Sequence, residues 1–451
     1  MEEKKLASRA AIICYGFGDL ASQFVWTFVG SYLTIFYSDV VGLAPAAVSA
    51  IMLIARIWDA VNDPMMGAIA ERTRSRWGRF RPYIAFGCPF LAILGVLTFT
   101  APFGGGKAVI WAGVTYIVAG MIYTLVNIPY GAMAAVMSTD SGQINQINTS
   151  RNIGMNLGMV VVNALSAPLM LAMSGKGAEV ATAHGYTMTA VIYGIVSIPL
   201  FLLVFFTARE NVKPVAQAQK FSFSETFKNL VKNKYLMIIT LVMALLMTAF
   251  MGRIAVTAFY VIYCLGSFKL ISIIMTIPSI GSIVGSFAVP FLCKKLGKRN
   301  TLMLSMVLNA VGLLVIYLAP FDNIPMVIIG DVIFGITSIG FPISLSMVAD
   351  SVDYMEEKTG VRTDGTAYAT YGLATKIGNA VGGAVGLPLM VAFGYVANQG
   401  QTPEAMHGIN MVVNLFPAIL FLLGAAACLL WRMSDKDADD IRARLRSKRE
   451  Q

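Results

Sequence analysis

The stretch ARIWDAVNDPMMGAIAERTRSRWGRFRPY, residues 55–83, joins a long apolar segment to a short loop rich in arginine. Within the apolar part, polar and charged side chains recur at spacings of three and four residues: Arg56, Asp59, Asn62 and Asp63. This spacing places them on one face of a helix. Asp59 precedes Arg72 by 13 residues, a rise of roughly 20 Å along a helix. The stretch therefore predicts a membrane-spanning helix with ionisable groups at bilayer depth.

The composition of the whole chain agrees with a membrane protein. Of 451 residues, 57% are hydrophobic and only 13% are charged, and the mean hydropathy is +0.70. A soluble protein carries about 25% charged residues. These values exclude a disordered chain and an ordinary soluble enzyme. The net charge of +10 lies in short loops between apolar runs, which indicates membrane topology and no nucleic-acid partner.

Twelve apolar segments are each long enough to span a bilayer as a helix. We predict spans at about 9–38, 43–71, 82–102, 107–137, 147–173, 187–208, 236–265, 270–293, 301–319, 325–350, 365–395 and 408–432. Transmembrane barrels would show ten-residue alternating segments instead. The fold class is therefore an all-α polytopic membrane protein with twelve transmembrane helices in two six-helix halves.

Basic residues set the orientation and the organisation of these spans. One set of alternate connections holds almost all of them, and the other holds only Lys107, Lys176 and Lys269. This imbalance predicts that both termini lie in the cytoplasm. RWGRFR at 76–81 and KLGKRN at 295–300 follow the second span of each half, as in transporters built from repeats. We divide the chain into an N-terminal half (1–208), a middle linker (209–235), a C-terminal half (236–433) and a tail (434–451).

The face with Asp59, Asn62 and Asp63 is a candidate cation site. Carboxylate and amide oxygens are hard ligands that suit a small cation such as Na⁺. The same carboxylates would alternatively carry a proton, because burial and mutual repulsion raise a carboxyl pKa. The structural alternative is that Arg56 neutralises one aspartate, although the negative charge of the second aspartate then has no counter-charge on this face.

Other spans supply polar groups and aromatic rings suited to a sugar. A sugar site needs groups that bond hydroxyls and an apolar ring for the sugar face. The polar candidates are Asp19, Asn127, Arg151 and Lys376, and the candidate rings are Trp26, Tyr123, Tyr130 and Phe341. Asp331 in span 10 and Arg253 in span 7 stand apart, and a structural ion pair explains them as well as a site does.

Four strings together resemble the glycoside–pentoside–hexuronide:cation symporters of the major facilitator superfamily, which include the melibiose carrier. They are 55–83, YTLVNIPYGAM at 123–133, MVADSVDYMEEKTGVRTDGTAY at 347–368 and GYVANQGQTPEAMHGI at 394–409. The resemblance implies a cation site at Asp59, Asn62, Asp63 and Thr124. It implies a sugar site at Asp19, Asn127, Arg151 and Phe341, with Lys376 near both. This chain departs from the melibiose carrier at Asn127, Gly131 and Phe341. Its string VNIPYG, residues 126–131, instead resembles the glucuronide and xyloside branches of the family.

We interpret the chain as a transporter that imports a glucuronide, xyloside or galactoside with Na⁺ or H⁺ by alternating access. Cation binding would release Arg56 or Lys376 from pairing. Arg76 and Arg79 would pair with Glu71, or with Asp350 and Asp353 at the end of span 10, to close the cytoplasmic side. A proton-coupled exporter on the same fold is the alternative, and an embedded enzyme would need a nucleophile, base or metal cluster that the sequence lacks.

The expected partners are the glycoside, the coupling cation and membrane lipid, without another cofactor. The expected location is the bacterial inner membrane, and the expected functional form is a monomer.

Overall fold

The computed structural model describes residues 6–211, 233–360, 362 and 364–449, and this part of the chain is helical with connecting turns. Each of the twelve predicted spans coincides with helix. Within the described ranges, 11 helical stretches have the length and hydropathy to cross a membrane. The prediction of an all-helical polytopic membrane protein is confirmed.

The chain packs as two compact units, which we describe separately. Unit 1 comprises Met1–Ala216, Ala255–Thr276 and Gly394–Thr402. Unit 2 comprises Gln217–Ile254, Ile277–Phe393 and Pro403–Gln451. Unit 1 thus contains two segments from the second half of the sequence.

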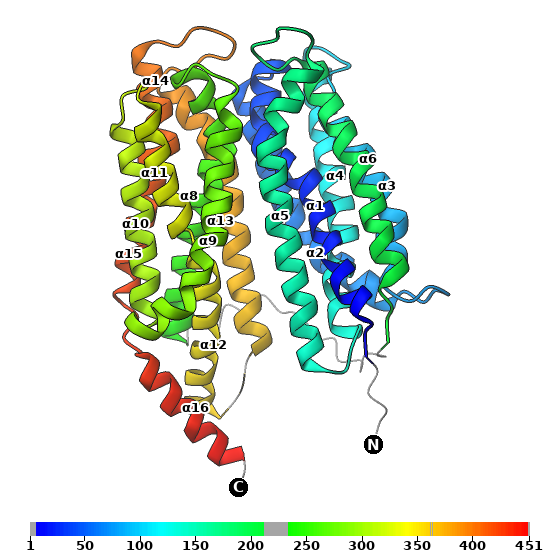
Figure 1. Ribbon diagram of the computed structural model, residues 1–451, viewed down its shortest axis with the longest axis vertical. Coiled ribbons are helices and arrows are strands. Elements are labelled where there is room, and N and C mark those ends of the chain that lie inside the picture. Colours follow the sequence, from blue (N-terminus) through cyan, green and yellow to red (C-terminus); the bar gives the residue numbers. More distant parts are fainter. Residues whose placement is uncertain (1–5, 212–232, 361, 363, 450–451) are drawn as a thin grey trace. The chain divides into compact units, whose positions relative to one another are not determined.

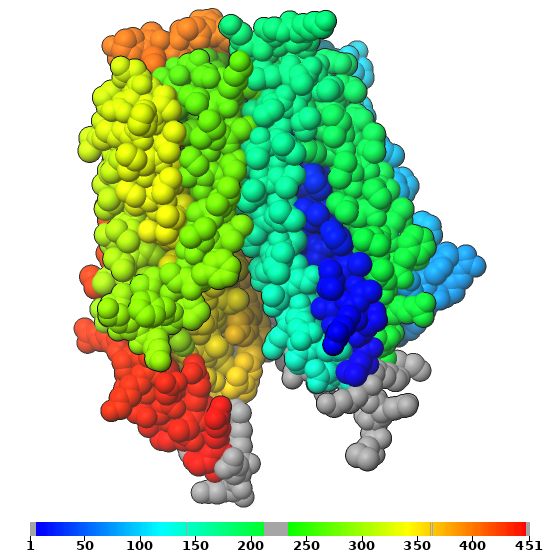
Figure 2. Space-filling model, in the orientation of Figure 1, coloured from blue at the N-terminus to red at the C-terminus, as the bar shows by residue number. Residues whose placement is uncertain are grey.

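Six long helices build most of unit 1. They are α1 (Arg9–Ile35), α2 (Pro45–Arg72), α3 (Arg81–Thr98), α4 (Gly106–Met133), α5 (Ser141–Met173) and α6 (Ala183–Thr207). Helix α1 packs between α5 and α6, and Figure 2 shows its blue surface flanked by both. A Cβ atom on Gly154 would lie 1.9 Å from the carbonyl oxygen of Gly16. Only glycine permits this crossing of α1 and α5.

A five-residue π-helical turn ends the first span of each sequence half. Turn η1 (Phe36–Val40) follows α1, and η3 (Tyr260–Cys264) follows α8 (Lys234–Phe259). Turns of this kind are uncommon and concentrate at functional sites. Their equivalent places give the two sequence halves a shared local structure.

Unit 2 contains most of the remaining helices. After the first part of α8 come α9 (Leu270–Leu296), α10 (Lys298–Leu318), α11 (Ile324–Thr337), α12 (Gly340–Thr359), α13 (Asp364–Ala392), α14 (Pro403–Asn410), η4 (Met411–Leu415), α15 (Phe416–Cys428) and α16 (Asp435–Arg449). The predicted span at 325–350 is divided between α11 and α12. The side-chain hydroxyl groups of Thr337 and Ser338 both donate to Asn309, and Pro342 has no N–H for the carbonyl of Ser338.

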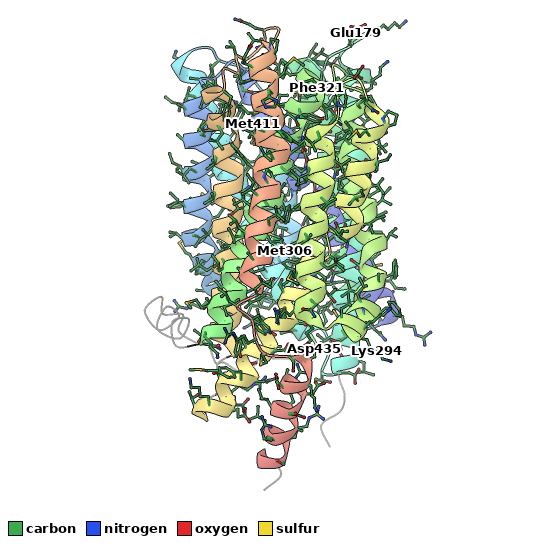
Figure 3. The ribbon with its side chains drawn as sticks, turned by 90° about the vertical axis from the view of Figure 1, so that its left-hand side faces the viewer. Glu179, Lys294, Met306, Phe321, Met411 and Asp435 are labelled. Atoms are coloured by element: carbon green, nitrogen blue, oxygen red, sulfur yellow. The ribbon has the colours of Figure 1, made fainter. Side chains whose placement is uncertain are left out.

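The predicted tail forms helix α16, which packs against α12. Ala438, Ile441 and Leu445 are buried, at the spacing of one helical face. Figure 3 shows Asp435 where α16 begins, and its carboxylate accepts a hydrogen bond of 3.0 Å from the backbone N–H of Lys298. The tail is therefore part of unit 2.

Candidate transport site

The predicted cation residues of α2 and α4 meet in unit 1. The hydroxyl group of Thr124 donates to Asp63 Oδ1 at 2.8 Å. Asn62 is 1% exposed, and among the described residues its Nδ2 has no hydrogen-bond partner. A 180° turn of the amide exchanges its oxygen and nitrogen, so Asn62 offers either atom here. The structure therefore brings two of the four predicted cation residues, Asp63 and Thr124, into contact, and Asn62 precedes Asp63 on α2.

Asp59, the fourth predicted cation residue, lies against Arg56 and α4. Arg56 Nη1 is 3.4 Å from Asp59 Oδ2, and both side chains are about three-quarters buried. A Cβ atom on Gly120 would lie 3.2 Å from Asp59 Oδ1, so this glycine makes room for the carboxylate. The Arg56 guanidinium group also lies over the ring of Trp26, 5.4 Å from its centroid. Arg56 thus contacts both a predicted cation ligand and a predicted sugar platform.

Trp26 connects the cation residues to the predicted sugar residues of α4. Its ring stacks on Tyr123, with 4.2 Å between centroids and 15° between planes. The Tyr123 hydroxyl group accepts a hydrogen bond of 2.6 Å from Asn127 Nδ2. Stacked rings with a polar group at one end suit a sugar, which has an apolar face and hydroxyl groups at its edge.

Asp19 and Arg151 form an ion pair between α1 and α5. Arg151 Nε donates to Asp19 Oδ2 at 2.8 Å, and Tyr130 OH donates to the same oxygen at 3.1 Å. Arg151 also lies over the Tyr130 ring, 4.9 Å from its centroid. The Arg151 side chain keeps 26% exposure, and a Cβ atom on Gly131 would lie 3.8 Å from it. Tyr130 therefore holds the Asp19 carboxylate in place, while part of the Arg151 side chain stays exposed.

These contacts form three groups of side chains on α1, α2, α4 and α5, which together with Asn62 we call the polar strip. Its members are Asp19, Trp26, Arg56, Asp59, Asn62, Asp63, Tyr123, Thr124, Asn127, Tyr130 and Arg151. The strip brings together carboxylates, aromatic rings and neutral hydrogen-bonding groups.

Two predicted sugar residues belong to unit 2. The Phe341 side chain is 46% exposed, and its ring lies 6.3 Å from that of Tyr371. Lys376 lies on α13 and is half-buried. Arg253 and Asp331 pair with each other at 2.6 Å, with side chains 5% and 0% exposed. Burial of both partners indicates a structural role for that pair.

The arginine loop of unit 1 is organised by a residue that the sequence reasoning missed. The Glu210 carboxylate accepts hydrogen bonds from the backbone N–H groups of Arg79, Phe80 and Arg81 at 2.7–3.3 Å. A carboxylate at a helix N-terminus is favoured by the helix dipole. Gly78 has φ +109°, and a Cβ atom there would lie 2.5 Å from Glu210 Oε1. The available signal was an acidic residue directly after the sixth span.

The predicted gating arginines have local contacts within this loop. Arg76 lies over the ring of Trp77, 4.0 Å from its centroid, and Arg79 lies over Phe80 at 4.5 Å. Arg79 Nη1 also lies 3.4 Å from the backbone carbonyl oxygen of Glu71. The predicted pairing of these arginines with carboxylates of α12 stays a prediction.

Asp350 and Asp353 of α12 are bound by cations of unit 2. Lys298 donates to Asp350 at 2.6 Å, and Arg442 of α16 donates to both carboxylates. Arg362 donates to Asp353 at 3.0 Å. The sequence reasoning missed these partners, because they come from three separate segments.

Arg362 also forms ion pairs with two further carboxylates. It pairs with Asp364 and Glu356, each at 2.6 Å. The hydrogen bonds to Asp364 and Glu356 raise the pKa of the Arg362 guanidinium group above its usual value. This arginine therefore stays charged and holds the end of α12 to the beginning of α13.

A second carboxylate cluster in unit 1 was also missed. Asp39, the fourth residue of η1, accepts a hydrogen bond of 2.5 Å from Tyr263, the fourth residue of η3. Tyr395 OH donates to the same carboxylate, and Asn398 Nδ2 donates to the Asp39 backbone carbonyl. Asn398 has φ 58°, a left-handed conformation that asparagine tolerates. This cluster, the Asp39 latch, ties η1 to two segments from the second half of the sequence.

The chain is similar to known proteins over most of its length. Residues 14–435 match the family model described as MFS/sugar transport protein. The isoprimeverose transporter of Lactiplantibacillus pentosus is 32% identical over 424 residues, covering 93% of this chain and 88% of that protein. The glucuronide carrier protein homolog of Escherichia coli (strain K12) is 30% identical over 438 residues, covering 95% and 94%.

The crystal structure of a D-xylose–proton symporter has a TM-score of 0.66 to this chain at 14% identity, covering 95% of this chain and 98% of that one. At this identity the likeness shows the fold alone, which is that of the major facilitator superfamily.

Proposed function

We propose that this chain, which belongs to the MFS/sugar transport protein family of glycoside–pentoside–hexuronide:cation symporters, imports a glycoside with Na⁺ through the polar strip. Cation-coupled glycoside symport across a membrane is the activity of this family. The proposal adds that the coupling ion is Na⁺, that transport is inward, and that the polar strip binds both ligands.

The observation that carries the proposal is the gathering of these groups on α1, α2 and α4. Thr124 donates to Asp63, Asp59 lies four residues before Asp63 on α2 and pairs with Arg56, and Arg56 lies over Trp26. An ion bound at the carboxylates and a sugar bound at the rings would share Arg56 as a neighbour. Coupling between two ligands requires such a shared element, whose state both ligands bias.

Asn62 and Thr124 favour Na⁺ over a proton as the coupling ion. A proton needs only one carboxylate, whereas a metal cation gains from each added oxygen ligand. Thr124 already lies 2.8 Å from Asp63, so its oxygen is placed to join the same coordination shell. Two carboxylates with two neutral oxygens suit a small monovalent cation.

The sugar would lie along the rings of Trp26 and Tyr123, with its hydroxyl groups toward Asn127, Asp19 and Arg151. Arg151 offers bidentate donors, and Asp19 offers acceptors. Gly131 leaves the Arg151 side chain uncovered. We therefore assign the substrate to the xyloside or glucuronide kind, as the names of the two relatives suggest.

Cation binding would weaken the hold of Asp59 on Arg56. The two groups are already 3.4 Å apart, which is long for a charge-assisted hydrogen bond. A cation between Asp59 and Asp63 competes for the same oxygen atoms, so Arg56, which already lies over Trp26, is released from Asp59 to complete the sugar platform. The coupling free energy expected for two such sites is about 1–3 kcal/mol.

Alternating access would use the Asp39 latch on the outer side and the arginine loop on the inner side. Basic loops place both termini in the cytoplasm, which puts Asp39, at the far end of α1, outside. Breaking its contacts to Tyr263 and Tyr395 would open the strip outward. Arg76 and Arg79 would close the inner side in that state by reaching Asp350 and Asp353. We place this monomeric carrier in the bacterial inner membrane.

Uptake into proteoliposomes tests the proposal. A labelled xyloside and a labelled glucuronide are each offered with an inward Na⁺ gradient, with an inward proton gradient, or with K⁺ only. The expected result is concentrative uptake of one sugar with Na⁺ alone, which Asp63→Asn abolishes and Asp322→Asn, a change at an exposed loop, leaves intact. Accumulation driven equally by protons, or export of a dye without sugar uptake, would contradict the proposal.

A further inference from the structure

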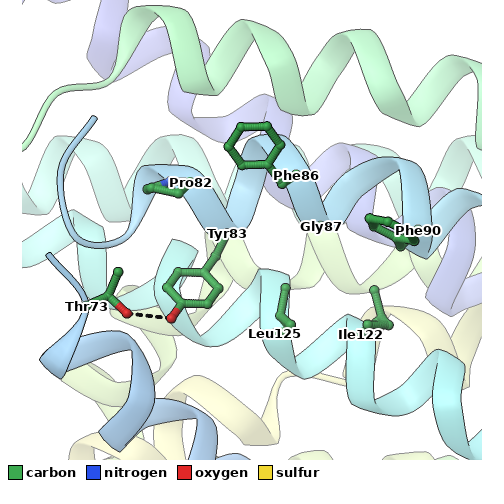
Figure 4. Close-up of a pocket in the computed structure, with 8 residues that line it drawn as sticks. All are labelled: Thr73, Pro82, Tyr83, Phe86, Gly87, Phe90, Ile122 and Leu125. Atoms are coloured by element: carbon green, nitrogen blue, oxygen red, sulfur yellow. Dashed lines mark hydrogen bonds between the residues drawn. The ribbon is translucent and has the colours of Figure 1, made fainter. Parts of the chain in front are cut away.

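An apolar hollow lies on unit 1 between α3 and α4. Its volume is about 410 Å³, and it is lined by Thr73, Pro82, Tyr83, Phe86, Gly87, Phe90, Ile122 and Leu125. Figure 4 shows Tyr83 of α3 on the side of Leu125 and Ile122 of α4, and the Phe86 ring on the other side of α3. Phe86 and Phe90 are 57% and 60% exposed. Both rings lie on α3, which has the length and hydropathy of a membrane span, and we take this hollow to be open to lipid.

The hollow has one polar end. Thr73 Oγ1 and Tyr83 OH are hydrogen-bonded at 2.5 Å there (Figure 4), and the opposite end is formed by Phe90 and Ile122. From Tyr83 to Phe90 the helix rises roughly 10 Å. A slot of this length, polar at one end and apolar along the rest, has the shape of a bound acyl chain.

Two arginines stand at the polar end. Arg74 Nη1 donates to the backbone carbonyl of Thr73 at 3.3 Å. Arg76 lies over Trp77, whose ring is 5.4 Å from that of Phe86, a wall of the hollow. Both arginines are exposed. Tryptophan and tyrosine mark the membrane–water boundary, so this end lies at headgroup depth.

We propose that the α3–α4 hollow with Arg74 and Arg76 is a binding site for an anionic glycerophospholipid of the cytoplasmic leaflet. One acyl chain fills the hollow from Tyr83 to Phe90. The phosphate is bound by the exposed guanidinium groups of Arg74 and Arg76, whose forks suit phosphate oxygens, in the state in which Arg76 does not reach Asp350 and Asp353. The positive charge of the two arginines selects an anionic headgroup, and the α3–α4 hollow holds the acyl chain. Binding therefore needs both the arginines and the hollow.

Native mass spectrometry of the full chain in detergent tests this site with dioleoyl phosphatidylglycerol and dioleoyl phosphatidylcholine as probes. Each arginine near an anionic headgroup contributes about fivefold in affinity. We expect phosphatidylglycerol to bind more tightly than phosphatidylcholine. Arg74→Gln with Arg76→Gln should remove about 25-fold of this preference, and Lys294→Gln with Lys295→Gln, at the end of α9, should not.

The groove is tested by filling it and by labelling it. Leu125→Trp should weaken binding of both lipids, whereas Val284→Trp, at an exposed position of α9, should not. A phosphatidylglycerol with a diazirine in its acyl chain should label peptides of α3 and α4 in the unmodified protein, which requires no variant to fold. Equal binding of the two lipids, an unchanged preference in the arginine variant, or labelling spread evenly over the helices would overturn the proposal.

Discussion

Replacing Thr124 with valine isolates one oxygen of the proposed cation site. Valine keeps the shape of the side chain but removes the hydroxyl group that lies 2.8 Å from Asp63 Oδ1. Thr124 is 4% exposed, so water does not readily replace the lost oxygen. Losing one hydrogen-bonding partner of a charged group costs about 1.4 kcal/mol, which is roughly tenfold in an equilibrium constant.

We therefore expect the Na⁺ concentration for half-maximal uptake to rise about tenfold in Thr124→Val. The assay measures initial glycoside uptake in proteoliposomes over a series of Na⁺ concentrations. Thr124→Ser is the matched control, because it keeps the oxygen and loses only a methyl group. Unchanged Na⁺ activation in Thr124→Val would refute the assignment of this hydroxyl group to the cation site.

Three further predictions concern other contacts. Arg151→Lys should weaken glycoside binding by about tenfold while Na⁺ binding persists, because lysine lacks the planar guanidinium group that can bond Asp19 and the sugar at the same time. Calorimetry on the purified protein measures the Kd of both ligands. Glu210→Gln should lower the melting temperature by about 1 °C, because removing the charge weakens the contact with the start of α3 by about 1 kcal/mol, and a scan that matches the wild type would count against this role. Tyr263→Phe should shift the carrier toward outward opening by about 1–2 kcal/mol, seen as greater thiol labelling from the outer side; equal labelling would remove Asp39 from the gate.

The span pattern was predictable because bilayer thickness dictates it. Every predicted segment coincides with helix, since roughly 20 apolar residues have no other stable form in a bilayer. The division of the tenth span was not predictable from hydropathy. It depends on the hydroxyl groups of Thr337 and Ser338 bonding to Asn309 on a different helix. Hydropathy records no such tertiary contact.

The site was predictable where its residues lie on one helix. Spacing placed Arg56, Asp59 and Asp63 on a shared face, and the structure gives the Arg56–Asp59 contact that spacing suggests. The meeting of Asp19 with Arg151 was not available from spacing, because 132 residues separate them. Their charged side chains within apolar spans made both residues candidates, and the structure supplied their pairing. Periodicity describes one helix at a time, whereas a transport site uses several.

The residues that reasoning missed are single polar groups outside any periodic pattern. Asp39 and Glu210 lie one and two residues after a predicted apolar span, where an acidic residue is ordinarily read as solvated. Their partners are backbone N–H groups for Glu210 and tyrosines distant in sequence for Asp39. Neither kind of partner leaves a signal in the sequence near the carboxylate.

Reciprocal coupling between the two ligands is the most direct test of the polar strip. Calorimetry on the purified chain measures the Kd of the glycoside with and without saturating Na⁺, and the Kd of Na⁺ with and without saturating glycoside. Linkage requires both ratios to be equal, and a coupling of about 1–3 kcal/mol predicts a factor of roughly 5–150. Equal factors in this range, reduced toward one by Arg56→Gln, are the predicted result. A glycoside Kd that does not change with Na⁺ would contradict the account.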